Sequence, residues 1–134
     1  MEYSFQYRII NRFMINKKTL VIGASTKPER YSNQAIRLLR RYDHPVEAIG
    51  LRSGQVADIE FKTGFPELNQ IHTITMYVGQ SRQPQYYDYL LGLKPKRIIF
   101  NPGTENDEFS ELLEEQGVEV VEHCTLVMLN SGLF

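Results

Sequence analysis

Apolar residues gather in five short runs along the chain, and the first of them, at residues 19–22, is rich in β-branched residues. Continuous runs of this kind are typical of strands that are buried on both faces of a parallel sheet. We therefore predict five strands, at residues 19–22, 46–51, 73–78, 97–100 and 118–121.

Between the first two runs, apolar side chains recur at helical spacing. Ala35, Leu38, Leu39 and Tyr42 fall on one helical face, which predicts a helix over 32–42 that ends before Asp43-His44-Pro45.

Two further helices are predicted from their start and stop signals. Pro84 suits a first helical turn, and the pattern after it predicts a helix to residue 91. Thr104 is predicted to cap a helix over 104–116, with Asp107 as its capping-box-like partner and Gly117 as the stop.

Three segments are less regular. Residues 56–61 predict one short extra strand, and residues 125–129 predict a final turn of helix. Residues 1–16 alternate apolar and polar side chains, which predicts a short strand or a peripheral arm, and we assign this extension no function.

Strands and helices therefore alternate along 17–134, a length suited to one domain. This alternation predicts the α/β class, with a Rossmann-like, doubly wound sheet of about five parallel strands in three layers.

Composition narrows the classes of partner. The net charge is -1, with cations and carboxylates interspersed, which argues against a nucleic-acid-binding surface. No apolar run approaches the roughly 20 residues of a membrane span. Cys124 is the single cysteine, which fits a cytoplasmic protein, and the three histidines lack metal-ligand spacing, so no metal site is predicted.

The carboxyl ends of the strands are where an open α/β sheet binds its ligands. The loop into the first helix carries Ser25, Lys27, Arg30 and Ser32, and a helix N-terminus favours an anion. The loop that begins at Thr104 instead carries three carboxylates, which would repel a phosphate. The first helix is therefore the predicted phosphate site.

The identity of the nucleotide is constrained by two departures from the dinucleotide pattern. Gly23 is the only glycine of its turn, so G-x-G-x-x-G is absent. Arg52 stands after the second strand, where an NAD site has an acidic residue. A cation there suits a ligand with an extra ribose phosphate, such as coenzyme A or NADP.

No catalytic set is recognised, so we leave enzymatic activity open. His123 and Cys124 are adjacent, and along a strand they would point to opposite faces, which disfavours a Cys–His pair. Cys124 is read as a small residue near a strand end, with a mixed disulfide to a bound thiol as the alternative.

Several segments together resemble a known family. Gly23-Ala24-Ser25, Pro28, Arg30 and Ser32, then Asn101-Pro102-Gly103-Thr104-Glu105-Asn106 and Cys124, resemble the stand-alone bacterial CoA-binding domain proteins and the CoA-binding domain of the succinyl-CoA synthetase alpha subunit. The resemblance implies a Rossmann-like fold, with the Gly23–Ser25 turn and Ser32 at the pyrophosphate and the loop after the second strand near the adenosine. The ligase domain of those enzymes is not part of the resemblance.

The favoured function is therefore non-catalytic binding of coenzyme A or an acyl-CoA as a small-molecule nucleotide ligand. An NADP-dependent oxidoreductase and a nucleotide-sensing regulatory or interaction protein are the alternatives, and a weakly held homodimer is left open. The candidate binding residues are Gly23, Ala24, Ser25, Lys27, Arg30, Ser32, Asn33, Gly50, Arg52, Val78, Asn101, Pro102 and Gly103.

Overall fold

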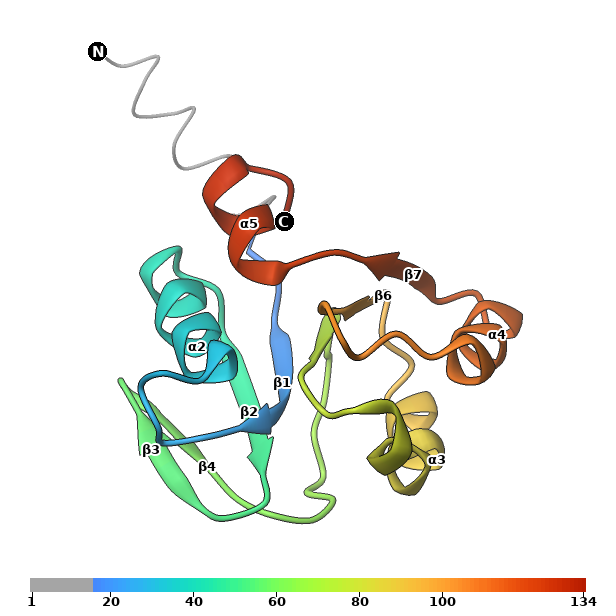
Figure 1. Ribbon diagram of the computed structural model, residues 1–134, viewed down its shortest axis with the longest axis horizontal. Coiled ribbons are helices and arrows are strands. Elements are labelled where there is room, and N and C mark those ends of the chain that lie inside the picture. Colours follow the sequence, from blue (N-terminus) through green and yellow to red (C-terminus); the bar gives the residue numbers. More distant parts are fainter. Residues whose placement is uncertain (1–15) are drawn as a thin grey trace.

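A five-stranded parallel sheet forms the centre of the computed structural model, which describes residues 16–134 (Figure 1). Every pairing between neighbouring strands of this sheet is parallel. The predicted fold class is thus confirmed. The strands, in spatial order, are β2 (Val46–Gly50), β1 (Thr19–Ala24), β5 (Thr73–Met76), β6 (Arg97–Phe100) and β7 (Glu119–Glu122).

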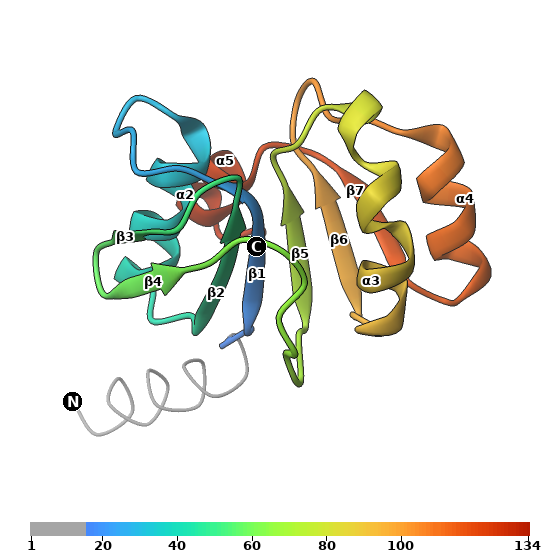
Figure 2. The ribbon, with the colours of Figure 1, turned by 90° about the horizontal axis from the view of Figure 1, so that it is seen from below.

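Helices cover both faces of the sheet (Figure 2). One face carries α2 (Tyr31–Arg41) and α5 (Thr125–Ser131), and the other carries α3 (Tyr87–Gly92) and α4 (Asp107–Glu115). None of the helices within 16–134 has the length and apolar character needed to span a lipid bilayer. The predicted N-terminal strand or arm lies outside the described residues.

Side chains of the central strands alternate between two cores, as the pleat of a strand requires. Leu20 and Ile22 pack on the side of α3 and α4, whereas Val21 packs on the side of α2. All three are fully buried. Burial on both faces explains why these strands are continuous apolar runs in the sequence.

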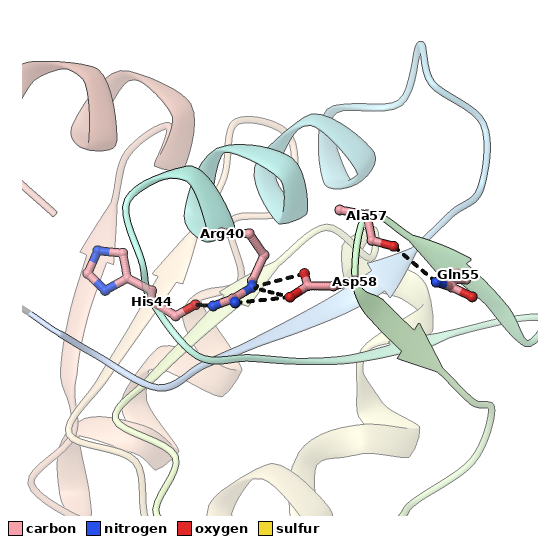
Figure 3. Close-up of polar contacts among 5 residues, drawn as sticks. All are labelled: Arg40, His44, Gln55, Ala57 and Asp58. Carbon is pink, nitrogen blue, oxygen red and sulfur yellow. Dashed lines mark hydrogen bonds and ion pairs between the residues drawn. The ribbon is translucent and has the colours of Figure 1, made fainter.

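The connection from β2 to β5 differs from the prediction of one extra strand over 56–61. It folds into an antiparallel hairpin, β3 (Gly54–Val56) and β4 (Ile59–Phe61), which turns at Ala57 with a φ of 54°. Arg40 of α2 holds this turn: its Nε and Nη2 atoms each donate to the Asp58 carboxylate at 3.0 Å (Figure 3).

The start of α4 also corrects a prediction. Its N-cap is Asn106, whose Oδ1 accepts the Phe109 amide at 3.0 Å, and the helix begins at Asp107. The Thr104 hydroxyl instead donates to the Asn101 carbonyl at 2.8 Å. The capping residue is therefore two positions later than predicted, because Thr104 belongs to the turn after β6.

The helix predicted from Pro84 begins later than expected as well. Two 3₁₀ turns, η1 (Gln80–Arg82) and η2 (Pro84–Tyr86), precede it, and regular α-helix starts at Tyr87. Gln83 lies between the two turns. These turns lengthen the loop that follows β5, and this loop reaches the site described below.

Counted along the chain, the parallel strands have the order 2-1-3-4-5 of a doubly wound fold. The chain winds outward in opposite directions from β1 and β5. Folds of this kind bind ligands in the crevice outside the carboxyl ends of those two strands. The topology therefore locates the candidate site beside the loops after β1 and β5.

Candidate functional site

A cavity of about 540 Å³ lies at the carboxyl ends of β1, β2 and β5. This volume falls in the range of about 300–1,000 Å³ that is usual for small-molecule sites. Most of the residues predicted from the sequence line it, namely Gly23, Ala24, Ser25, Lys27, Arg30, Ser32, Gly50, Arg52, Val78 and Pro102.

Two glycines allow the backbone to pass close to its neighbours at the floor of this cavity. Gly23 has a φ of +100°, and a Cβ there would lie 3.1 Å from the carbonyl carbon of Tyr77. A Cβ at Gly50 would lie 2.5 Å from the Ala24 carbonyl oxygen. A larger residue at Gly23 would push β1 away from the end of β5, and one at Gly50 would push β2 away from β1.

The loop from Ser25 to Arg30 is ordered by its own hydrogen bonds. The Ser25 hydroxyl accepts the Lys27 amide at 3.1 Å, and the Asn33 side chain donates to the Ser25 carbonyl at 2.9 Å. Within the described residues, no side chain caps α2 at Arg30, and its first turn holds no acidic residue. The amides at the start of α2 are thus free to donate to a bound anion.

Cations dominate the electrostatics of the cavity. Lys27, Arg30, Arg52 and Arg82 all line it, and no aspartate or glutamate of residues 16–134 does. The ion pairs found in the described part of the chain, Lys18–Glu47 and Arg40–Asp58, lie elsewhere. In a chain with a net charge of -1, four cations thus line one cavity at the carboxyl ends of the strands.

Sequence reasoning missed several lining residues, of which three matter here. Arg82 closes η1, in the loop that follows β5. Tyr31 and Leu51 are 69% and 72% exposed, although both are large and apolar. Exposed apolar side chains beside a cationic cavity suit a ligand that carries both phosphate and an organic ring.

Asn33, Asn101 and Gly103 were predicted for the site but do not line the cavity. Asn101 is 3% exposed, and its amide donates to the Thr75 hydroxyl and accepts the Thr125 amide. Its side chain thus fastens β6 to β5 and to α5. Asn33 is also buried, and its side chain supports the Ser25 loop from below.

Tyr77 lines the cavity with an uncharged side chain. Its hydroxyl oxygen is buried without a hydrogen-bond partner in the described chain. Burial raises the pKa of Tyr77 to about 12, while the nearby Thr75 and Thr125 hydroxyls act in the opposite direction. Tyr77 is therefore a phenol, and not a phenolate, at neutral pH.

His123 and Cys124 do not form a side-chain pair. Since β7 ends at Glu122, both residues follow the strand, and the predicted strand alternation does not apply to them. The His123 Nδ1 atom instead accepts the backbone amide of Cys124 at 2.7 Å. Within residues 16–134, no group of three or more His, Cys, Asp or Glu residues could hold a metal ion.

A second hollow, of about 480 Å³, lies at the opposite edge of the sheet, beside residues 94–96 and 116–118. These segments precede β6 and β7, so this hollow faces the amino ends of the strands. Ligands of doubly wound sheets bind at the carboxyl ends. We therefore take the first cavity, where loops, cations and an uncapped helix meet, as the functional site.

The fold and the cavity define the protein as a Rossmann-like domain with a cationic cavity at its topological switch point. Residues 17–130 match the family model described as the CoA binding domain. The chain belongs to that family.

Solved structures share this fold. An uncharacterized protein is 42% identical with a TM-score of 0.86, over 89% of this chain and 98% of that one. A Thermus thermophilus protein is 21% identical with a TM-score of 0.79, over 96% and 98% of the two chains. A hypothetical protein from Pyrococcus horikoshii is 22% identical with a TM-score of 0.79, over 95% and 90%. Comparison with curated protein sequences gives no significant match.

Proposed function

We propose that this protein binds coenzyme A or an acyl-CoA in the cavity between β1, β2 and β5, and that it holds the ligand without reacting with it. The observation that carries the proposal is the set of four cations around a cavity that no carboxylate of the described residues lines. Membership of the CoA binding domain family supports the same ligand class.

The parts of coenzyme A correspond to the parts of the cavity. Its diphosphate would lie at the turn from β1 to α2, where the free helical amides, Lys27 and Arg30 converge. Its 3′-phosphate would lie beside Arg52, after β2. The apolar side chains of Tyr31 and Leu51 would flank the adenosine.

The uncharged arm of the ligand would then extend toward β5 and β6. Val78, Tyr86, Pro102 and Thr104 line that half, and they offer an apolar surface with few polar groups. Gln83 fixes its shape, because its side chain donates to the Val78 and Thr104 carbonyls at 2.8 and 2.7 Å.

Isothermal titration calorimetry with coenzyme A, dephospho-CoA and NADP tests this proposal. We expect coenzyme A to bind, and dephospho-CoA to bind more weakly because it lacks the phosphate facing Arg52. Arg30→Ala should weaken the binding of coenzyme A by about 1.5–3 kcal/mol. Arg41→Ala, at the far end of α2, should leave the binding of coenzyme A unchanged.

Two results would contradict the proposal. If millimolar coenzyme A gives no heat of binding, the protein is not a coenzyme A binder. If NADP binds more tightly than coenzyme A, the cavity serves a nicotinamide nucleotide, because Arg52 would then face a 2′-phosphate.

A further inference from the structure

Arg82 differs from the other cavity cations in its position across the sheet. Arg52 follows β2, and Lys27 and Arg30 follow β1, whereas Arg82 ends η1 after β5. Because β1 lies between β2 and β5, Arg82 stands on the opposite side of the phosphate turn from Arg52. Figure 2 shows the loop after β5 rising beside the carboxyl end of β6.

The proposed ligand has no charge to offer at this position. Its phosphates occupy the β1 and β2 side, and the arm that extends toward β5 and β6 is uncharged up to its terminal thiol. Lining residues on that side, such as Val78, Tyr86 and Pro102, suit an uncharged arm, but the guanidinium of Arg82 does not. No carboxylate of the described chain lines the cavity to pair with it.

The segment that carries Arg82 is held in place. The Arg82 amide donates to the Gly79 carbonyl at 3.0 Å, and the Gln85 side chain donates to the Arg82 carbonyl at 3.2 Å. The next residue, Gln83, is fully buried, and its side chain donates to the Val78 and Thr104 carbonyls after β5 and β6. The backbone of Arg82 is thus anchored on the β5 and β6 side, and its exposed side chain lines the cavity there.

We infer that the preferred ligand is an acyl-CoA whose acyl group ends in a carboxylate, and that Arg82 determines this specificity by pairing with it. The inference rests on the proposed function, because it takes the orientation of coenzyme A from that proposal. A planar guanidinium matches a carboxylate with two parallel hydrogen bonds, which neutral acyl groups cannot form.

Calorimetry with matched acyl-CoAs tests the inference. Malonyl-, succinyl- and glutaryl-CoA provide carboxylates at increasing length, and propionyl-, butyryl- and valeryl-CoA are their neutral counterparts. We expect at least one carboxylate ligand to bind roughly tenfold or more tightly than its counterpart. Arg82→Gln should abolish this preference, and it should weaken unacylated coenzyme A less than Arg52→Gln does.

Arg52→Gln is the matched control, since it removes the same charge from the other side of the cavity. It should weaken every ligand by the same factor and retain the carboxylate preference. Equal affinities of the wild-type protein for both ligand series would overturn the inference. The inference would also be overturned if Arg82→Gln no longer bound unacylated coenzyme A, because Arg82 would then contact a phosphate. If no CoA compound binds, the proposed function itself fails.

Discussion

At the scale of single residues, Gly23 lets the backbone take the path that the wall of the cavity requires. Its φ of +100° allows β1 to bulge between Ile22 and Ala24, and the absence of a Cβ lets the Tyr77 backbone approach. The sequence shows this position as the only glycine of a strand-to-helix turn. The turn that could hold a phosphate is thus also the contact between β1 and the end of β5.

Gly23→Ala should destabilise the fold by about 1–3 kcal/mol, because the substitution adds both backbone strain and a crowded Cβ. Gly64→Ala is the control, since Gly64 also has a positive φ, of +78°, but no atom within 4 Å of its Cβ position. Urea unfolding of both variants separates strain from crowding. Equal losses in the two variants would mean that the approach of Tyr77 costs nothing.

At the scale of elements, a buried polar network joins the loops on the β5 and β6 side of the cavity. Asn106 caps α4 through its Oδ1 atom and donates to the Gln83 Oε1 atom at 2.9 Å and to the Tyr87 hydroxyl at 2.8 Å. Gln83 in turn donates to the backbone carbonyls of Val78 and Thr104. One capped helix therefore fixes part of the cavity wall.

Asn106→Ala should lower the free energy of unfolding by about 2–4 kcal/mol, since it removes the cap and leaves Gln83 Oε1 buried without a donor. Thr104→Val is the comparison, because it removes one hydroxyl that donates only to the Asn101 carbonyl. Chemical denaturation of both variants measures the difference. If Thr104→Val loses as much free energy of unfolding as Asn106→Ala, or more, then Thr104 and not Asn106 is the main cap of α4.

The elements also show how far the sequence predicts this structure. Apolar runs located β1, β2, β5 and β6 because those strands are largely buried on both faces, and the run at β7 located a strand that is only half-buried. The β3–β4 hairpin was missed because its turn places Ala57 at a positive φ, a conformation usually taken by glycine or asparagine. Arg82 was missed because it lies in a 3₁₀ turn, which no hydrophobic period marks. Asn101 was predicted for the site, but its side-chain amide makes its hydrogen bonds to Thr75, Met76 and Thr125 inside the fold.

At the scale of the whole molecule, cations lie at both ends of the parallel strands. Those at the carboxyl ends line the cavity, whereas Lys17 and Arg97 at the amino ends lie close to His44 and His72. His44 is 4% exposed there, and its Nδ1 atom accepts the Lys17 amide at 2.9 Å. Burial, with the charges of Lys17 and Arg97, lowers the pKa of His44 to about 4.

This lowered pKa makes stability depend on pH. Unfolded His44 takes up a proton near pH 6.5 and folded His44 only near pH 4, so stability is complete above pH 6.5 and falls as the pH drops through that window. The loss should reach about 2–3 kcal/mol by pH 4. Urea unfolding of wild type and His44→Asn, which keeps an acceptor for Lys17, should show a shallower pH slope in the variant. Identical slopes would exclude His44 as the source.

The most direct test of the central claim is a titration of the ¹⁵N-labelled protein with coenzyme A, followed by amide chemical shifts. A chain of 134 residues suits this measurement, which reports both binding and its location. The largest changes should fall in the segment from Ala24 to Ser32, at Arg52 and at Val78, while residues 94–96 and 116–118 stay unchanged. No change at millimolar coenzyme A, or changes centred on the hollow at the opposite edge, would contradict a coenzyme A site at the switch point.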